Sequence, residues 1–254
     1  MKILFLGTGS AFCLKNYHSN ALIIQNNKKL LIDAGSDIRF ALAEQNLSYK
    51  DIDSVYISHF HNDHTGGLEY LAFKSFFDTD KKKIQLLIHK NFVDILWENS
   101  LKASMGMIFD KQHTINDFFD VVALEKSFIW EDVKFELIET QHVTVSNFDT
   151  PVFGLLIIAD KKLYITGDTR FLPELLNKIY NISDIIIHDT ETSHDKSIIH
   201  ASYDDLIKLS PDIKAKSYLW HYQDNVTEDY TFWQKSAIKN GFKGFLKKGD
   251  SIEI

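Results

Sequence analysis

Three histidines and one aspartate fall within six positions of a single stretch of this chain. They are His59, His61, Asp63 and His64, in the sequence Ser-His-Phe-His-Asn-Asp-His. The stretch follows an apolar segment, residues 55–58, that predicts a short buried strand, and it precedes two glycines. Imidazole nitrogens and carboxylate oxygens are ligands that divalent ions such as Zn²⁺ prefer. The chain must therefore fold so that one strand delivers a loop of four candidate metal ligands.

Short apolar segments alternate with amphipathic ones along the rest of the chain. The pattern predicts strands at residues 3–6, 21–24, 29–32, 55–58, 84–88, 121–124, 134–139, 152–158, 163–166, 185–187 and 217–220. Helical spacing is found at residues 38–45, 66–77, 92–101 and 203–209. No Gly/Ser-rich linker interrupts the sequence, which has only three prolines. We expect a mixed α/β fold and one domain that spans residues 1–254.

The composition indicates the cellular location of the protein and the kinds of partner it can bind. The 254 residues are 44% hydrophobic, which is enough for one sizeable core, but no apolar run approaches the roughly 20 residues of a membrane span. Cys13 is the only cysteine, so no intramolecular disulfide can form, and a cytoplasmic location is expected. The net charge of −7 disfavours nonspecific nucleic-acid binding, which depends on Lys and Arg.

The ligand-rich loop resembles the His-x-His-x-Asp-His motif of the metallo-β-lactamase superfamily, whose fold is a four-layer αββα sandwich. Further resemblances follow in the same order along the chain: Leu-Ile-Asp-Ala-Gly at residues 31–35, His142, Thr-Gly-Asp-Thr at residues 166–169, and His221. The resemblance implies that His59, His61 and His142 bind one metal ion. It implies equally that Asp63, His64 and His221 bind a second ion, that Asp168 bridges the two, and that Asp33 orients the ligand loop.

A bridging carboxylate also makes chemical sense at Asp168. This residue follows an apolar strand and a glycine, and a carboxylate can join two cations about 3.5–4 Å apart. A hydroxide held between the ions would be the nucleophile, because coordination lowers the pKa of water to about 7. We expect two divalent ions as cofactors. Zinc is the first candidate, and manganese and iron fit the same ligands.

Other short segments resemble one branch of the superfamily, which contains ribonuclease Z and cyclic-nucleotide phosphodiesterases. They are Leu-Gly-Thr-Gly-Ser-Ala-Phe at residues 6–12, Ser-Asn-Ala at 19–21, His-Asp-Thr-Glu at 188–191 and His-Ala-Ser at 200–202. The resemblance implies that His200 is a histidine that binds no metal and is paired with an acid, either Asp189 or Glu191. His200 would give a proton or a positive charge to the leaving alkoxide. The expected catalytic residues are His200, Asp189 and Asp63.

Two departures from ribonuclease Z bear on the substrate. The Gly/Pro-rich arm that grips transfer RNA has no counterpart here, and His221 lacks the Ser and Arg that usually follow it. A cyclic nucleotide or another small phosphodiester, such as an immune signal, is therefore the expected substrate. Processing of the tRNA 3′ end is the alternative, and a non-catalytic nucleotide-sequestering protein is a second. An aromatic-rich segment, residues 74–125, is expected to form a lid or the interface of a homodimer.

Overall fold

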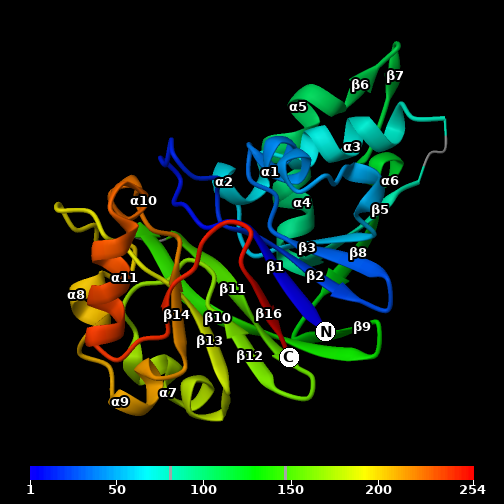
Figure 1. Ribbon diagram of the computed structural model, residues 1–254. Helices are drawn as coiled ribbons and strands as arrows, with labels where there is room; N and C mark the ends of the chain where they lie inside the picture. Colours follow the sequence, from blue (N-terminus) through cyan, green and yellow to red (C-terminus); the bar gives the residue numbers. More distant parts are fainter. Residues whose placement is uncertain (80–81, 146–147) are drawn as a thin grey trace.

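The computed structural model describes residues 1–79, 82–145 and 148–254, and in this part of the chain two seven-stranded sheets pack face to face (Figure 1). The first sheet has the order β16 (Ser251–Glu253), β1 (Lys2–Gly7), β2 (Asn20–Gln25), β3 (Lys28–Ile32), β4 (Ser54–Ile57), β5 (Ile84–His89) and β8 (Phe119–Leu124). The second has the order β15 (Gly244–Phe245), β14 (Ser217–Trp220), β13 (Ile185–Asp189), β12 (Lys162–Ile165), β11 (Phe148–Ile158), β10 (Val133–Val145) and β9 (Ser127–Trp130).

Helices cover the outer face of each sheet. Beside the first sheet lie α1 (Ile38–Glu44), α2 (Asn62–Thr65), α3 (Leu68–Phe76), α4 (Val93–Leu96), α5 (Lys102–Met105) and α6 (Ile115–Phe118). Short 3₁₀ turns at Tyr49–Asp51 and Lys90–Phe92 and a π-helical stretch at Trp97–Leu101 complete this layer. Beside the second sheet lie α7 (Pro173–Ile182), α8 (Tyr203–Leu206), α9 (Pro211–Lys214), α10 (Asp224–Glu228) and α11 (Tyr230–Lys239).

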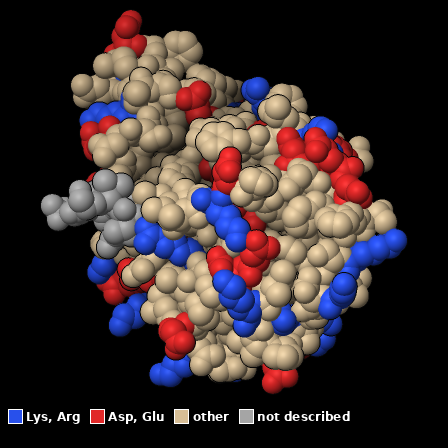
Figure 2. Space-filling model, turned by 90° about the vertical axis from the view of Figure 1, so that its left-hand side faces the viewer, with Lys and Arg blue, Asp and Glu red and all other residues tan. Residues whose placement is uncertain are grey.

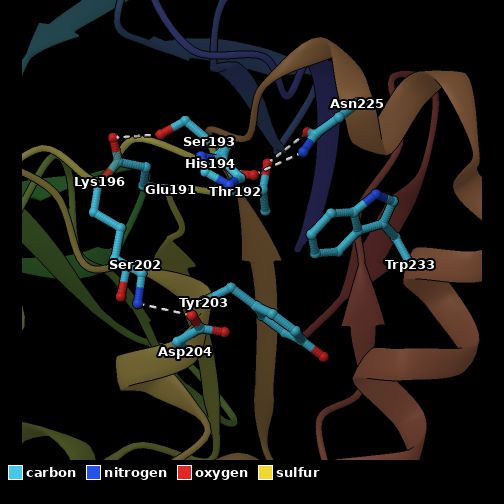
Figure 3. A pocket seen from close by; sticks show the side chains of 10 residues that line it. All are labelled: Glu191, Thr192, Ser193, His194, Lys196, Ser202, Tyr203, Asp204, Asn225 and Trp233. Carbon is cyan, nitrogen blue, oxygen red and sulfur yellow. Dashed lines mark hydrogen bonds and ion pairs between the residues drawn. The ribbon is translucent and has the colours of Figure 1, made fainter.

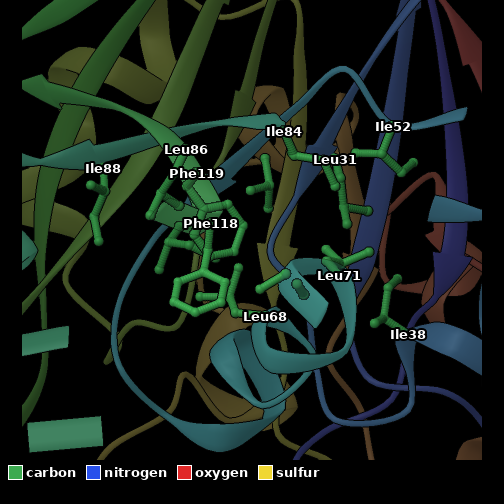
Figure 4. Close-up of a cluster of buried hydrophobic side chains, with 14 of the residues drawn as sticks. Leu31, Ile38, Ile52, Leu68, Leu71, Ile84, Leu86, Ile88, Phe118 and Phe119 are labelled. Atoms are coloured by element: carbon green, nitrogen blue, oxygen red, sulfur yellow. The ribbon is translucent and has the colours of Figure 1, made fainter. Parts of the chain in front are cut away.

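Three apolar clusters hold these layers together. The cluster between the sheets includes Phe5 from the first sheet and Ile165 from the second, because alternate residues of each strand point inward. A second cluster joins the first sheet to α3 and α6, with Leu68 packed among aliphatic and aromatic side chains (Figure 4). A third joins the second sheet to its helices, where Tyr180 is buried. This is the αββα sandwich that the resemblance predicts.

Most predicted strands are present, but several boundaries differ. The apolar pattern ends the strand before His142 at residue 139, whereas β10 continues to Val145 and pairs with β11. The extension carries polar residues, which apolar alternation cannot detect. The helix expected at residues 92–101 begins as a 3₁₀ turn at Lys90 and reaches Met105 through α4, the π-helical stretch and α5.

The segment expected to form a lid or an interface divides into two parts in the structure. Strands β5 and β8 at its two sides pair with each other in the first sheet. The chain between them, residues 90–118, packs its helices on the first sheet, and its hairpin of β6 (Met107–Ile108) and β7 (Lys111–Gln112) projects at the upper right of Figure 1. Residues 80 and 81 of the segment lie outside the described residues. Among the described helices, none has the length and apolarity needed to cross a membrane.

Candidate functional site

The site is built where parallel strands of both sheets end. In the first sheet, β3 and β4 run parallel, and β4 leads directly to His59. In the second sheet, β12, β13 and β14 run parallel; Asp168 follows β12 and His221 follows β14. The carboxyl ends of parallel strands are where α/β folds place their ligands. Residues far apart in the sequence are therefore brought to one edge of the sandwich.

Left-handed backbone turns point the side chains into this edge. Asp33 has φ of 59° and His221 has φ of 60°, while Gly167 before Asp168 has φ of 62°. Glycine adopts this conformation freely, whereas a non-glycine residue pays about 1–3 kcal/mol that the surrounding fold must offset. Such strain is common at functional sites. Asp33 and His221 adopt this conformation immediately after β3 and β14, and Gly167 adopts it directly before Asp168.

His142 reaches the site by a different device, a β-bulge. The register of β10 against β11 shifts between Gln141 and Val143, so that His142 is the extra residue of the bulged strand. A bulge re-aims one side chain without ending the strand. The His142 ring is fully buried, and its Nδ1 lies 2.7 Å from the carbonyl oxygen of Ile199.

Four candidate ligands form a first cluster: His59, His61, His142 and Asp168. Nε2 of His59 and Nε2 of His142 lie 3.7 and 3.6 Å from Oδ2 of Asp168. Nε2 of His142 is also 3.2 Å from Nδ1 of His61. The ligand atoms thus face one another around a common centre.

A second cluster lies next to the first and shares Asp168 with it: Asp63, His64, Asp168 and His221. Nε2 of His64 is 3.1 Å from Oδ2 of Asp63 and 3.3 Å from Oδ1 of Asp168. Nε2 of His221 is 3.3 and 3.4 Å from the same two oxygen atoms. Asp168 therefore turns Oδ2 to the first cluster and Oδ1 to the second.

The donor atoms fit a pair of metal ions. Zinc bonds of about 2.0–2.1 Å in tetrahedral geometry separate neighbouring ligand atoms by roughly 3.4 Å, close to the distances found in both clusters. Among the described residues, Nε2 of His59 and Nε2 of His64 have carboxylate oxygens nearby but no hydrogen-bond partner in suitable geometry, and both atoms are buried. A buried polar atom is costly unless it is satisfied, and a bound ion would satisfy both.

Outer contacts fix the orientation of the imidazoles. Asp33 accepts hydrogen bonds from the backbone N–H and the hydroxyl of Ser58, and it lies against Nδ1 of His64, each at 2.8 Å. The Ser58 hydroxyl is in turn 3.0 Å from Nδ1 of His59. Such contacts hold a metal-binding imidazole in the required tautomer. The sequence pointed to Asp33 but not to Ser58, whose only signal is its place immediately before His59.

Burial and charge set the ionisation of the clusters. Burial lowers the pKa of His59, which stays neutral as a metal ligand must. Burial opposes a charge on His64 and His221, yet the carboxylate of Asp168 raises the pKa of both. Burial likewise opposes ionisation of Asp168, but the imidazoles of His221 and His64 lower its pKa well below the usual range. The bridging carboxylate is thus anionic and suited to cations.

His200 and Asp189 form a pair beside the two clusters. Nδ1 of His200 lies 2.8 Å from Oδ2 of Asp189, and the His200 ring centroid is 4.6 Å from that of His142 and 5.0 Å from that of His221. Burial lowers the pKa of His200, but the Asp189 carboxylate outweighs it and raises that pKa overall. Burial raises the pKa of Asp189, yet His200 and His221 lower it to about 2.

The sequence left two acids open as the partner of His200, and the hydrogen bond is with Asp189. The other oxygen of Asp189 lies 3.2 Å from Nδ1 of His221, so this carboxylate contacts both histidines. Glu191 points elsewhere and binds Ser193 and Ser197.

The chain also matches known proteins. The family model described as "Anti-Pycsar protein Apyc1" matches residues 1–252. A protein of that name from Paenibacillus sp. (strain J14) is 35% identical over 89% of this chain and 91% of its own length. One from Bacillus phage vB_BveM-Goe7 is 32% identical over 89% and 91%. The crystal structure of the metallo-β-lactamase fold protein YhfI from Bacillus subtilis covers 100% of this chain and 98% of its own, with a TM-score of 0.75 at 17% identity. The chain therefore belongs to the Anti-Pycsar protein Apyc1 family, and it is a metal-dependent phosphodiesterase of the metallo-β-lactamase fold.

Proposed function

We propose that this protein hydrolyses a cyclic nucleotide or a similar small phosphodiester at a site that holds two divalent ions. The observation that carries the proposal is the pair of four-ligand clusters that share Asp168, with the His200–Asp189 pair next to them. His59, His61 and His142 would hold one ion; Asp63, His64 and His221 would hold the other. Zinc fits these ligands, as do manganese and iron.

The bound ions would neutralise phosphate oxygens and lower the pKa of a water molecule that attacks phosphorus. The side chains of the protein would hold the two ions and the reacting groups in place. Asp168 keeps the two centres adjacent, and Asp63, which is 5% exposed, sits between His64 and His221 as an acceptor near the reacting atoms. Two opposed sheets hold these groups, so little reorganisation is needed when a substrate binds.

His200 would act on the leaving group. Asp189 holds Nδ1 of the ring, so Nε2 is the atom that would pass a proton to the leaving alkoxide. Asp189 is itself fixed by the backbone N–H of Thr169, which donates to it at 2.9 Å. This arrangement supports hydrolysis of an ester with a poor leaving group, such as the alkoxide of a cyclic nucleotide.

Surface charge favours a small substrate over transfer RNA. The chain carries a net charge of −7, and on the face shown in Figure 2 basic side chains are interspersed with acidic ones. Affinity for a nucleic-acid backbone grows with the number of phosphates that Lys and Arg contact, which a surface of mixed charge disfavours. A relative from a bacteriophage bears the name Anti-Pycsar protein, which supports a role against a host signal.

The segment at residues 74–125 would serve as a lid or as the interface of a homodimer, through its projecting β6–β7 hairpin. It carries exposed apolar side chains at Met107 and Phe109, and the Phe109 ring lies 6.1 Å from that of Phe77. Exposed apolar side chains that lie together, as Phe77 and Phe109 do, are typical of interaction surfaces, whereas single ones are not. Light scattering of the purified protein, compared with the Phe109→Asp variant, tests the dimer.

A cytoplasmic location fits the single cysteine, because a chain with one cysteine forms no intramolecular disulfide.

One experiment separates the candidate functions. The metal content of the purified protein is measured, and the protein is incubated with cyclic mono- and oligonucleotides and with precursor tRNA. We expect turnover of a cyclic nucleotide and none of tRNA. Cleavage of tRNA alone would reverse the assignment to a ribonuclease Z-like endonuclease, and tight nucleotide binding without product would mark a sequestering protein.

A further inference from the structure

The loop that carries His200 is held by an acid that the proposed chemistry does not use. This loop, residues 190–201, joins β13 to α8 and is called the His200 loop below. It contributes two groups to the site: the imidazole of His200, bound to Asp189, and the carbonyl of Ile199, which lies against Nδ1 of His142. The position of this loop therefore governs both a proposed proton donor and a proposed metal ligand.

Glu191 is the internal anchor of the loop. Its side chain is 6% exposed, and it accepts the backbone N–H of Ser197 on both oxygens, at 3.0 and 2.9 Å. It also accepts the hydroxyl of Ser197 at 3.1 Å and that of Ser193 at 2.8 Å. Within the described residues no Lys, Arg or His side chain forms an ion pair with it. A carboxylate that is buried in this way is satisfied only while the loop keeps its present path.

Apolar packing does not replace this anchor. His194 and Asp195 have fully exposed side chains, and Ile198 is 84% exposed. A segment with little buried apolar surface opens locally at low cost unless polar contacts hold it. The loop tip is such a segment. Glu191 binds Ser193 and Ser197 within it, while Thr192 at its start is bound to Gln223 and Asn225, and Lys196 is paired with Asp204.

A cavity lies along the loop next to Glu191. It has a volume of about 450 Å³ and is lined by Glu191, Ser193, Lys196, Tyr203 and Trp233, among others. Figure 3 shows Glu191 and Ser193 joined across one side of it, with the Tyr203 and Trp233 rings on the other. Solvent thus reaches this part of the loop, and close packing cannot fix it there.

We propose that Glu191 is a positioning residue for hydrolysis: its carboxylate closes the His200 loop on itself through Ser197 and Ser193 and so places His200 against Asp189. This inference rests on the proposed role of His200. The hydrogen bonds of the Glu191 side chain to described residues are with Ser193 and Ser197 and not with the candidate metal ligands, so it would act through the loop. Its loss should lower kcat more than it changes KM.

A double-mutant cycle tests whether Glu191 affects catalysis through His200. In the wild-type background, Glu191→Ala is expected to reduce kcat about 10–100-fold, and Glu191→Gln, which keeps the size and one acceptor oxygen, by less. In the His200→Ala background, Glu191→Ala should reduce kcat by a smaller factor than in the wild type, because only the contact of the Ile199 carbonyl with His142 is left for the loop to position. Equal losses in both backgrounds would overturn the proposal.

Limited proteolysis provides a readout that does not depend on activity. Trypsin cleaves after Lys196, which lies in the loop and is half exposed. Glu191→Ala should raise the rate of cleavage after Lys196 about 10-fold or more, since the loop opens more often. Glu125→Gln is the control, because Glu125 is an exposed acid paired with Lys90 outside the His200 loop, and it should leave both readouts unchanged.

The outcomes distinguish this inference from the proposed function. If the wild-type protein turns over no cyclic nucleotide, the proposed function fails, whereas faster cleavage after Lys196 would still establish the anchor. If the wild type is active and His200→Ala is impaired, but Glu191→Ala matches wild type in kcat and in proteolysis, only the role of Glu191 is wrong.

Discussion

Asp168 is the residue on which both metal clusters depend. Each of its oxygens faces a different pair of imidazoles, at 3.3–3.7 Å, and the side chain is almost fully buried. Removing it takes an acceptor from both centres: His59 and His142 lose the carboxylate that faces them, whereas His64 and His221 keep only Asp63 within the second cluster. No other described carboxylate stands in both clusters.

Asp168→Ala should therefore lose metal from both centres rather than from one. Turnover should fall by more than the roughly 10–100-fold that loss of an outer contact produces. Elemental analysis and kinetics check this, with Glu125→Ala, at an exposed position, as the control. A variant that keeps two ions per chain would refute the bridging role.

His200→Ala should lower the turnover number but, unlike Asp168→Ala, should leave the metal content unchanged. The ring belongs to the proton-donating pair rather than to the two clusters assigned to metal, so the metal content should stay at the wild-type level. The turnover number should fall about 10²–10⁴-fold, the usual contribution of general acid catalysis. The turnover of a substrate with a good leaving group, such as a nitrophenyl ester, should fall less, because such a leaving group needs no proton. An equal loss on both substrates would contradict the assigned role.

At the scale of elements, strand ends and the turns after them decide the site. The turns directly after β3, β4, β12 and β14 carry residues that contact a cluster or belong to one: Asp33, His59, Asp168 and His221. Short apolar strands are visible in the sequence, so the positions of Asp33, His59, Asp168 and His221 at strand ends could be predicted. The β-bulge at His142 could not, because a bulge depends on the register of a partner strand.

The starts of β3 and β4 are joined by Asp53, which makes stability depend on pH. Asp53 accepts the backbone N–H of Lys29 at 2.9 Å and the ammonium groups of Lys82 at 2.9 Å and Lys28 at 3.2 Å. Burial opposes ionisation, but these donors lower the pKa of Asp53 overall. A lowered folded pKa stabilises the fold above the unfolded value of about 3.9 and loses its effect as pH falls through the folded value.

Asp53→Asn should thus lower the free energy of unfolding by about 1 kcal/mol at pH 7, and by progressively less below about pH 4. Denaturant titrations of both proteins across that range check this. Acid also releases metal, but the effect is common to both proteins and cancels in the difference. A deficit that stays constant down to pH 2 would show that the carboxylate charge is not the cause.

On the scale of the whole molecule, the site joins the two sheets. His59 follows the first sheet, whereas Asp168 and His221 follow the second, and bound ions would crosslink the halves across the core between them. A ligand that binds only the folded state stabilises it in proportion to its affinity. Metal should therefore contribute to the stability of the whole fold.

Chelation should lower Tm by about 5–15 °C, and added Zn²⁺ should restore it. Calorimetry of the wild type and of Asp168→Ala, each with and without chelator, measures this. The variant should show little shift, because it has little metal to lose. The same large shift in both proteins would mean that the stabilising metal binds elsewhere.

The sequence by itself determined the fold class, the order of the candidate ligands and the class of chemistry. These are local properties: short strands, turn residues and ligand-type side chains at strand ends can be read one segment at a time. Only the tertiary structure decided that Asp189 rather than Glu191 binds His200, that Ser58 and the Ile199 carbonyl orient ligands, and that Glu191 holds a loop. Each of these is a contact between two segments, and its distance depends on how the sheets and loops pack.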